Sequence, residues 1–397
     1  MAAALGHRDF RILWIGACTS TIGTWMQKVA QNWLVLTISG SAFYLGLDSF
    51  LGELPILLFT LIGGVVADRH NRRFLLMGSQ VVQMTCAFVL MALVWLDLVQ
   101  IRYVLALSFV TGIAQAFGGP AYQSLIPQLV TKDHLPNAIA LNSIQFNIAR
   151  VVGPLLAGVT LAALGSAACF GLNGLSFVAV IAGLSLLRAD LRPPMARRPL
   201  LDELRGGLSY VRNQEALVAM TLLAFLATFL GLPLLTFLPV FAQTIFQSGV
   251  GEYSRMMAFS GAGAVAGALV VAWLGRFEHM GRLLLVVLGV FGALVAAFAL
   301  SRTLWVSHAL LVASGAALVT VFSLLMSLVQ LVAPNDMRGR VMSIYMVAFR
   351  GGSPLGSLAA GYLASQFSAP TVLFVNGLLI VAVAAFFLVR VHAVTEL

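Results

Sequence analysis

The feature that most limits how this chain can fold is a series of long apolar runs that follow one another almost without a break. A helix needs about 20 consecutive apolar residues to cross a bilayer, and the runs reach or approach that length. Helices also satisfy every backbone polar group within lipid. The chain is therefore predicted to be an all-α membrane protein with twelve transmembrane helices. The runs are 10–37, 42–66, 74–96, 103–126, 137–164, 168–187, 216–244, 253–274, 283–300, 304–330, 341–366 and 370–390.

Composition and charge support this assignment. The chain is 60% hydrophobic and 9% charged, whereas soluble proteins are about 45–50% apolar and about 25% charged. With a cytoplasmic N-terminus, the outer loops hold only Arg102, Arg255 and Arg302, and most other basic residues fall in cytoplasmic loops, as the positive-inside rule requires. We therefore expect a multi-pass protein of the bacterial inner membrane with both termini in the cytoplasm. The net charge of +9 is spread over short loops, so no nucleic-acid partner is expected.

The sequence also contains an internal repeat. Residues 143–155 and 343–355 share Ser, Ile, Arg, Pro and Leu at five matching positions, 200 residues apart. Two halves related by an axis along the membrane normal are typical of carriers that bind substrate near the bilayer midplane. We predict an N-terminal six-helix bundle over 1–187, a cytoplasmic linker over 188–215 and a C-terminal six-helix bundle over 216–397.

A cluster of charged residues and glycine follows the second run. Glycine allows helices to approach closely, and an acid beside several arginines can form a latch that shuts the inward face and releases it. The alternative is that the arginines only orient the chain. The cluster resembles the major facilitator signature between the second and third spans, with Asn71 in place of a glycine. Its members are Gly64, Asp68, Arg69, Arg72 and Arg73.

The fifth run carries Gly153, Pro154 and Gly158, and the eleventh run carries Pro354. Proline weakens a helix and glycine allows close packing, so these helices can bend. The alternative is an ordinary kinked packing helix. The pattern resembles the glycine-proline motif of exporters in the same superfamily, with Ala157 in place of one glycine. That resemblance implies flexing during transport.

Longer stretches carry a more specific resemblance. Residues 23–27, 39–42, 120–127 and 135–142 resemble the transmembrane secretion effectors, the branch of the major facilitator superfamily that contains the enterobactin exporter. The resemblance implies two pseudo-symmetric six-helix bundles and proton-driven efflux of siderophores, macrolides or other amphipathic compounds. One difference concerns the coupling, because many proton-driven exporters have an arginine in the fourth span and residues 103–119 contain none.

Five charged side chains lie inside the apolar runs: Lys28, Asp48, Glu53, Arg150 and Arg350. Each costs about 2.5–3.5 kcal/mol or more at the bilayer centre, so such residues are usually functional. We expect Glu53 to face Arg150 or a central cavity, and Asp48 to face Lys28. A carboxylate whose cation moves away gains a proton, which makes Glu53 the first and Asp48 the second candidate proton carrier. The alternative is a static ion pair between helices.

Polar and aromatic residues in the same runs are candidates for a substrate cavity. Binding sites combine apolar walls with a few placed polar groups, although a single polar residue in a span more often forms a hydrogen bond between helices. The candidates are Trp25, Gln27, Gln31, Phe50, Gln145, Asn147, Tyr345 and Phe349.

No enzymatic machinery is recognisable in the sequence. It contains no phosphate loop, nucleophile elbow or dinucleotide fingerprint. Cys18, Cys86 and Cys169 all lie in apolar runs and indicate neither a disulfide framework nor a metal site. We expect no catalytic residue, no cofactor and no metal, so that energy for transport comes from an ion gradient.

These observations favour secondary active export of amphipathic small molecules, of drug or siderophore type, by proton antiport with alternating access. The expected partners are the substrate, protons and the lipid bilayer, and the protein is expected to be a monomer. The alternatives are a lipid or siderophore carrier with other coupling or facilitated diffusion, and a non-transporting membrane scaffold or sensor.

Overall fold

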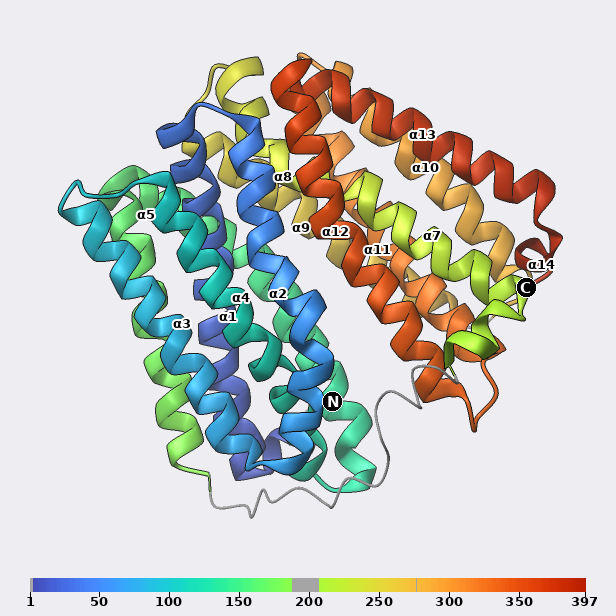
Figure 1. Ribbon diagram of the computed structural model, residues 1–397, viewed down its shortest axis with the longest axis horizontal. Coiled ribbons are helices and arrows are strands. Elements are labelled where there is room, and N and C mark those ends of the chain that lie inside the picture. Colours follow the sequence, from blue (N-terminus) through green and yellow to red (C-terminus); the bar gives the residue numbers. More distant parts are fainter. Residues whose placement is uncertain (1–2, 188–206, 276) are drawn as a thin grey trace. The chain divides into compact units, whose positions relative to one another are not determined.

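The computed structural model describes residues 3–187, 207–275 and 277–397, and these are nearly all helical (Figure 1). The predicted linker 188–215 lies largely outside the described residues. In the first half of the chain the elements are η1 (Ala3–Gly6), α1 (Arg8–Ser39), α2 (Ala42–Arg69), α3 (Arg72–Trp95), α4 (Ile101–Leu125), η2 (Ile126–Gln128), η3 (Lys132–His134) and α5 (Leu135–Ser185).

The second half contains the elements that follow the predicted linker. They are α7 (Glu215–Gly231), α8 (Pro233–Val240), the π-helical η4 (Phe241–Ile245), α9 (Val250–Leu274), α10 (Met280–Leu300), α11 (Leu304–Val332), α12 (Arg338–Gln366), α13 (Ala369–Arg390) and α14 (His392–Thr395). The seventh predicted run therefore divides into α7, α8 and η4. Pro233 stands at the first division, where a residue without a backbone N–H begins a new helix readily.

Helix α5 contains two predicted runs, 137–164 and 168–187, which meet at Gly165. Gly165 has φ 77° and ψ 179°, a conformation outside the helical region that glycine adopts without steric cost. In the first arm, residues 141 and 153 contact Trp14 and Trp25 of α1, so the residue numbers of the two helices increase together. In the second arm, residues 183 and 173 contact Ile12 and Gly23, so the residue numbers of the arm decrease as those of α1 increase. The two arms therefore form an antiparallel hairpin.

Nine helical stretches among the described residues are long and apolar enough to cross a membrane, and α5 with its two arms counts as one of them. Helices α1 and α12 are 32 and 29 residues long but fall outside this set. Both contain several charges, such as Lys28 in α1 and Arg350 in α12. These two helices carry residues that the sequence identifies as functional candidates.

The chain divides into two compact units. Among the described residues, the first contains 3–40, 51–187 and 250–255, and the second contains 41–50, 207–249, 256–275 and 277–397. The first turns of α2 therefore belong with the second unit, where a Cβ on Gly46 would collide with the carbonyl of Ser357. The first turns of α9 belong with the first unit, where a Cβ on Gly158 would lie 2.8 Å from the Cβ of Ser254.

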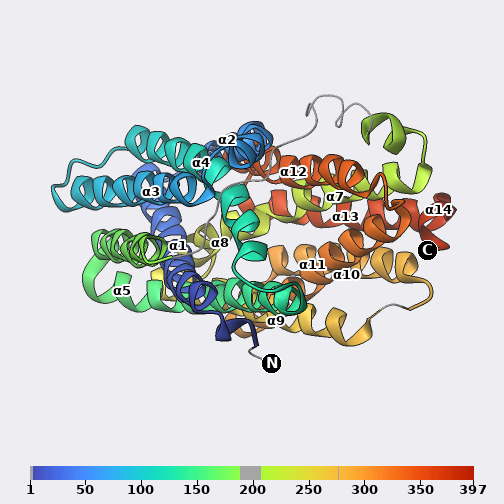
Figure 2. The ribbon, with the colours of Figure 1, turned by 90° about the horizontal axis from the view of Figure 1, so that it is seen from below.

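Corresponding helices pack through small residues in both units. In the first unit, a Cβ on Gly63 of α2 would collide with the carbonyl of Ala116 in α4. In the second, a Cβ on Gly267 of α9 would collide with the carbonyl of Ala316 in α11, 200 residues after Ala116. Small residues allow such backbone contact in membranes, where packing rather than water drives association. The ribbons of α3 and α4 run side by side in Figure 2. Between these helices Ser79 Oγ donates to the carbonyl of Ala114 at 2.7 Å.

Candidate functional site

One face of α1 carries a polar stripe at helical spacing. Thr21, Thr24, Lys28 and Gln31 recur every three or four residues and so share one side of the helix. Gln31 Nε2 donates to Ser108 Oγ of α4 at 2.8 Å, and Thr21 Oγ1 accepts from Gln145 Nε2 of α5 at 3.0 Å. The stripe is therefore flanked by α4 and α5 in the first unit, and Lys28 lies between the two hydrogen bonds.

Trp25 brings two cations together beside this stripe. The Lys28 ammonium lies 5.6 Å from the centre of the Trp25 ring, and the Arg150 guanidinium lies 5.9 Å from it. Both distances are typical of cation–π contacts. The ring of Phe146 meets Trp25 edge to face at 5.9 Å. One indole in the middle of α1 thus contacts a cation from its own helix and another from α5.

Gly153 determines how closely α1 and α5 approach at this point. A Cβ at position 153 would lie 2.5 Å from the Cβ of Trp25 and 2.9 Å from the carbonyl oxygen of Ile22. Any side chain at 153 would therefore push Trp25 away from α5. The neighbouring Pro154 is buried within α5, as Pro354 is within α12.

A second polar layer joins α4 to α5 near Thr21. Tyr122 Oη of α4 lies 2.8 Å from Asn142 Oδ1 and 3.3 Å from Gln145 Oε1, both of which accept from it. Gln145 is 4% exposed. The sequence singled out Gln145 but not Tyr122, Asn142 or Ser108, although a polar residue in an apolar run is the signal that would have found them.

Two other candidates for the substrate cavity, Gln27 and Asn147, form hydrogen bonds with other residues of the helices. Gln27 Oε1 accepts from Asn173 Nδ2 in the second arm of α5 at 2.6 Å, which fastens α1 to that arm. Asn147 Nδ2 donates to the carbonyl of Ser143 in its own helix at 2.9 Å. Of the predicted polar residues, Gln31 and Gln145 are the ones whose bonds flank the cation pair.

Of the two alternatives predicted for Glu53, the ion pair with Arg150 is not formed among the described residues. Among the described residues, Glu53 and Arg150 make no ion pair with each other or with any other side chain, and Arg150 contacts Trp25 instead. Glu53 is half-buried on α2, next to Gly52, whose carbonyl would collide with a Cβ on Gly112 of α4. Asp48 is 5% exposed and belongs to the second unit, whereas Lys28 belongs to the first.

The second unit contributes an aromatic cluster. Tyr345 is 1% exposed and stacks on Phe349 at 6.0 Å, and Phe349 meets Phe322 of α11 edge to face at 4.8 Å. The sequence identified Tyr345 and Phe349 but not Phe322. Arg350 follows directly in α12 with an exposed side chain, and Phe50 is half-buried in the α2 segment of the same unit.

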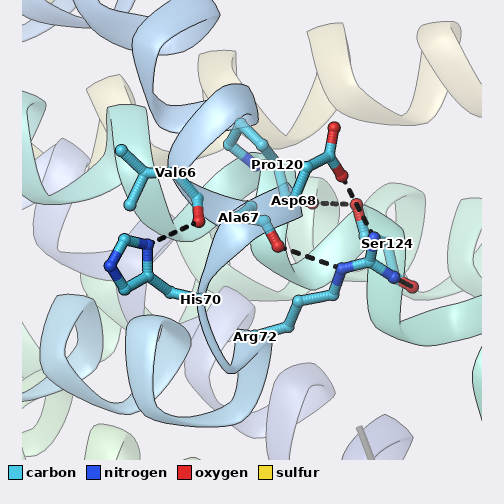
Figure 3. A network of polar contacts seen from close by, with 7 residues as sticks. All are labelled: Val66, Ala67, Asp68, His70, Arg72, Pro120 and Ser124. Atoms are coloured by element: carbon cyan, nitrogen blue, oxygen red, sulfur yellow. Dashed lines mark hydrogen bonds and ion pairs between the residues drawn. The ribbon is translucent and has the colours of Figure 1, made fainter. Parts of the chain in front are cut away.

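The loop after α2 holds the ends of several helices together (Figure 3). Arg72 is 8% exposed and donates to the carbonyls of Ala67 at 3.2 Å and Ser124 at 3.3 Å, and to Asp68 Oδ1 at 3.1 Å. Arg73 donates to the carbonyls of Leu187 and Ser185 at 3.0 and 2.6 Å. Guanidinium groups thus occupy the carbonyl ends of α2, α4 and α5, where cations are favoured.

One prediction for this loop is wrong. Gly64 was expected to allow a close helix contact, but a Cβ there would meet nothing within 4 Å. Gly63 makes that contact instead, against Ala116 of α4. The two glycines are adjacent, and helix periodicity turns one of them toward α4 and the other away from it. Arg69 is exposed, and the Asp68 side chain is 53% exposed.

A family model described as transmembrane secretion effector matches residues 1–397. The chain belongs to this family. The chain is 24% identical to macrolide efflux protein A of Streptococcus pyogenes, over 71% of its own length and 70% of the relative's. It is also 24% identical to the enterobactin exporter EntS of Salmonella typhi, over 91% and 87% of the two chains. The predicted family resemblance is confirmed.

Solved structures of membrane transporters share the fold of this chain. A bacterial homologue of the human lysosomal transporter Spinster, in an inward-facing and occupied conformation, matches it with a TM-score of 0.77 at 15% sequence identity. The match covers 98% of this chain and 96% of the other. The predicted all-α fold is confirmed by this match, and the family assignment with the apolar helices makes the chain a multi-pass membrane transporter.

Proposed function

We propose that this transporter exports amphipathic small molecules from the bacterial cytoplasm by alternating access, with protons entering in exchange. It acts as a monomer in the inner membrane, with both termini in the cytoplasm. The observation that carries the proposal is the presence of Lys28, Arg150 and Glu53 in the spans of one unit, with Lys28 and Arg150 both in contact with Trp25 of α1. A scaffold would gain nothing from three charges whose burial in lipid is costly.

Glu53 is the proton carrier in this proposal. Its carboxylate is half-buried and is held by no ion pair among the described residues. A carboxylate in that setting can exchange a proton with whichever side of the membrane the cavity opens to. Asp48 is the second carrier candidate, and Arg350 supplies a cation at the repeat-related position in α12.

The loop after α2 and the glycine-proline motifs of α5 and α12 have supporting roles in the same cycle. Asp68 keeps much of its side chain exposed even while it accepts from Arg72, so it remains available for a second partner that latches the inward face. The glycines of α5 and the prolines at 154 and 354 let α5 and α12 bend as access alternates.

The test measures efflux of ethidium, rhodamine 123 and fluorescein from cells that express the wild type, Glu53→Gln or Glu278→Gln. Glu278 is an exposed loop carboxylate and serves as the matched control. We expect efflux of at least one dye to require the protein and to stop with an uncoupler. We expect Glu53→Gln to lose the dependence on the pH gradient while Glu278→Gln keeps it. Full gradient-driven efflux by Glu53→Gln would remove this residue from the mechanism.

Facilitated diffusion is the second candidate function. The observation in its favour is the absence of an arginine from residues 103–119, where many proton-driven exporters have one. The two functions differ in accumulation, because a facilitator only equalises dye concentrations across the membrane. Expulsion against a concentration gradient in vesicles would exclude it.

A further inference from the structure

We infer that the site around Trp25 takes an organic anion with a flat apolar ring, which narrows the substrate class of the proposed exporter. The cluster that carries this inference consists of Trp25, Lys28, Phe146 and Arg150, which we call the indole–cation cluster. It lies wholly within the first unit. The inference rests on the proposed function for transport, but it concerns binding and can be tested separately.

The indole–cation cluster has a net positive charge. Lys28 and Arg150 are in contact with the same indole, and neither forms an ion pair with a carboxylate in the part of the chain that the structure describes, whereas Arg8, Arg72 and Arg255 pair with Asp9, Asp68 and Glu252 at 2.6–3.1 Å near helix ends. Of the carboxylates among the described residues in the α-helices of this unit, Asp9, Asp68 and Glu252 pair with arginines, which leaves Glu53 to offset one cation at a distance. Two cations against one carboxylate leave the cluster positive.

The Lys28 side chain points to a polar space and not to lipid. Lys28 belongs to the polar stripe of α1, with Thr21 bonded to α5 on one side of it and Gln31 bonded to α4 on the other. An ammonium facing hydrocarbon from mid-span would cost about 2.5–3.5 kcal/mol or more. The Lys28 side chain is nevertheless exposed, so the space in front of it is one that water or a polar ligand fills.

The indole–cation cluster also has an exposed aromatic surface that a flat ligand could cover. Phe146 is 51% exposed and meets the edge of Trp25, so an apolar ring surface adjoins the two cations. Arg binds a carboxylate or sulfonate through two parallel hydrogen bonds, and Lys binds it as a point charge. A ligand with an acidic group beside a flat ring would satisfy both cations and cover the exposed aromatic surface. A lipophilic cation would meet two like charges instead.

The direct test uses two dyes with the same xanthene frame and opposite charge, fluorescein and rhodamine 123. Binding to the purified transporter in phosphatidylcholine nanodiscs is followed by fluorescence anisotropy. We expect the wild type to bind fluorescein more tightly than rhodamine 123. We expect Lys28→Gln and Arg150→Gln each to weaken fluorescein binding about tenfold, without weakening rhodamine 123 binding.

Arg302→Gln is the matched control, since it removes one positive charge from an exposed outer loop. It should leave both affinities unchanged. A further arm needs no variant: 2-naphthoate should displace fluorescein from the wild type, and 2-naphthylmethylamine should not. Tighter binding of rhodamine 123, equal competition by the amine, or an equal loss of fluorescein binding in Arg302→Gln would each overturn the inference.

The same dyes distinguish this inference from the proposed function. Charge-dependent binding of fluorescein without any expulsion from vesicles would leave the inference standing and contradict export. Expulsion of rhodamine 123, together with its preferential binding, would support export and contradict the inference.

Discussion

At the scale of single residues, the approach of α1 to α5 depends on one missing side chain. Gly153 leaves room for the Trp25 Cβ and the Ile22 carbonyl, and Trp25 in turn holds both cations of the indole–cation cluster. Packing in this region therefore controls charge placement. A small change in the backbone of α5 would move Arg150 relative to Trp25 and Lys28, which both belong to α1.

We predict that Gly153→Ala destabilises the protein by about 1–3 kcal/mol, since overpacking a close contact forces neighbouring backbone and side chains to shift. Thermal unfolding in detergent, followed by tryptophan fluorescence, would show a lower midpoint. Gly64→Ala is the control, because its new methyl group would meet nothing within 4 Å. Equal midpoints for the two variants would contradict the packing described for Gly153.

At the scale of helices, the loop after α2 acts as a joint between helix ends. Arg72 reaches two backbone carbonyls on α2 and α4, and Arg73 reaches two at the end of α5. These bonds lie within one unit, so they give two of the three arginines in the loop a structural role that does not depend on any latch formed by Asp68. Arg69 makes no comparable contact among the described residues.

We predict that Arg72→Gln lowers the free energy of unfolding by about 2–4 kcal/mol, because it leaves the carbonyls of Ala67 and Ser124 without their donor and removes a buried charge-assisted bond. Arg69→Gln, which removes the same charge from an exposed position, should change the unfolding midpoint little. Size-exclusion profiles and unfolding midpoints measure both effects. A stable Arg72→Gln variant with a normal midpoint would show that the joint is dispensable.

The sequence predicted helices better than it predicted contacts. Apolar runs such as 216–244 locate spans because lipid demands about 20 apolar residues and full backbone bonding in each. Contacts such as Trp25 with Arg150 depend on the register between two helices, which periodicity does not specify. Burial cost alone predicted that Glu53 faces either Arg150 or a central cavity, and the structure shows Arg150 in contact with the Trp25 indole.

At the scale of the whole molecule, repetition extends from sequence to packing. The sequence repeat at 143–155 and 343–355 is accompanied by matching glycine contacts at Ala116 and Ala316, one in each unit. The two units nevertheless do not follow the predicted halves throughout, since 41–50 and 250–255 each belong with the other unit. Such segments are invisible to hydropathy, because a helix that changes unit along its length keeps the same apolar composition.

The two cations beside Trp25 also bear on the energetics of the proposed export cycle. If the inferred site selects an anion, export is electrogenic, and a membrane that is negative inside favours the outward step. One charge crossing 100 mV contributes about 2.3 kcal/mol. Exchange of one entering proton for one departing monovalent anion moves two charges in the same electrical sense, about 4.6 kcal/mol per 100 mV. Valinomycin with potassium should therefore slow fluorescein export more than nigericin does, and the reverse order would mean that voltage does little to power the cycle.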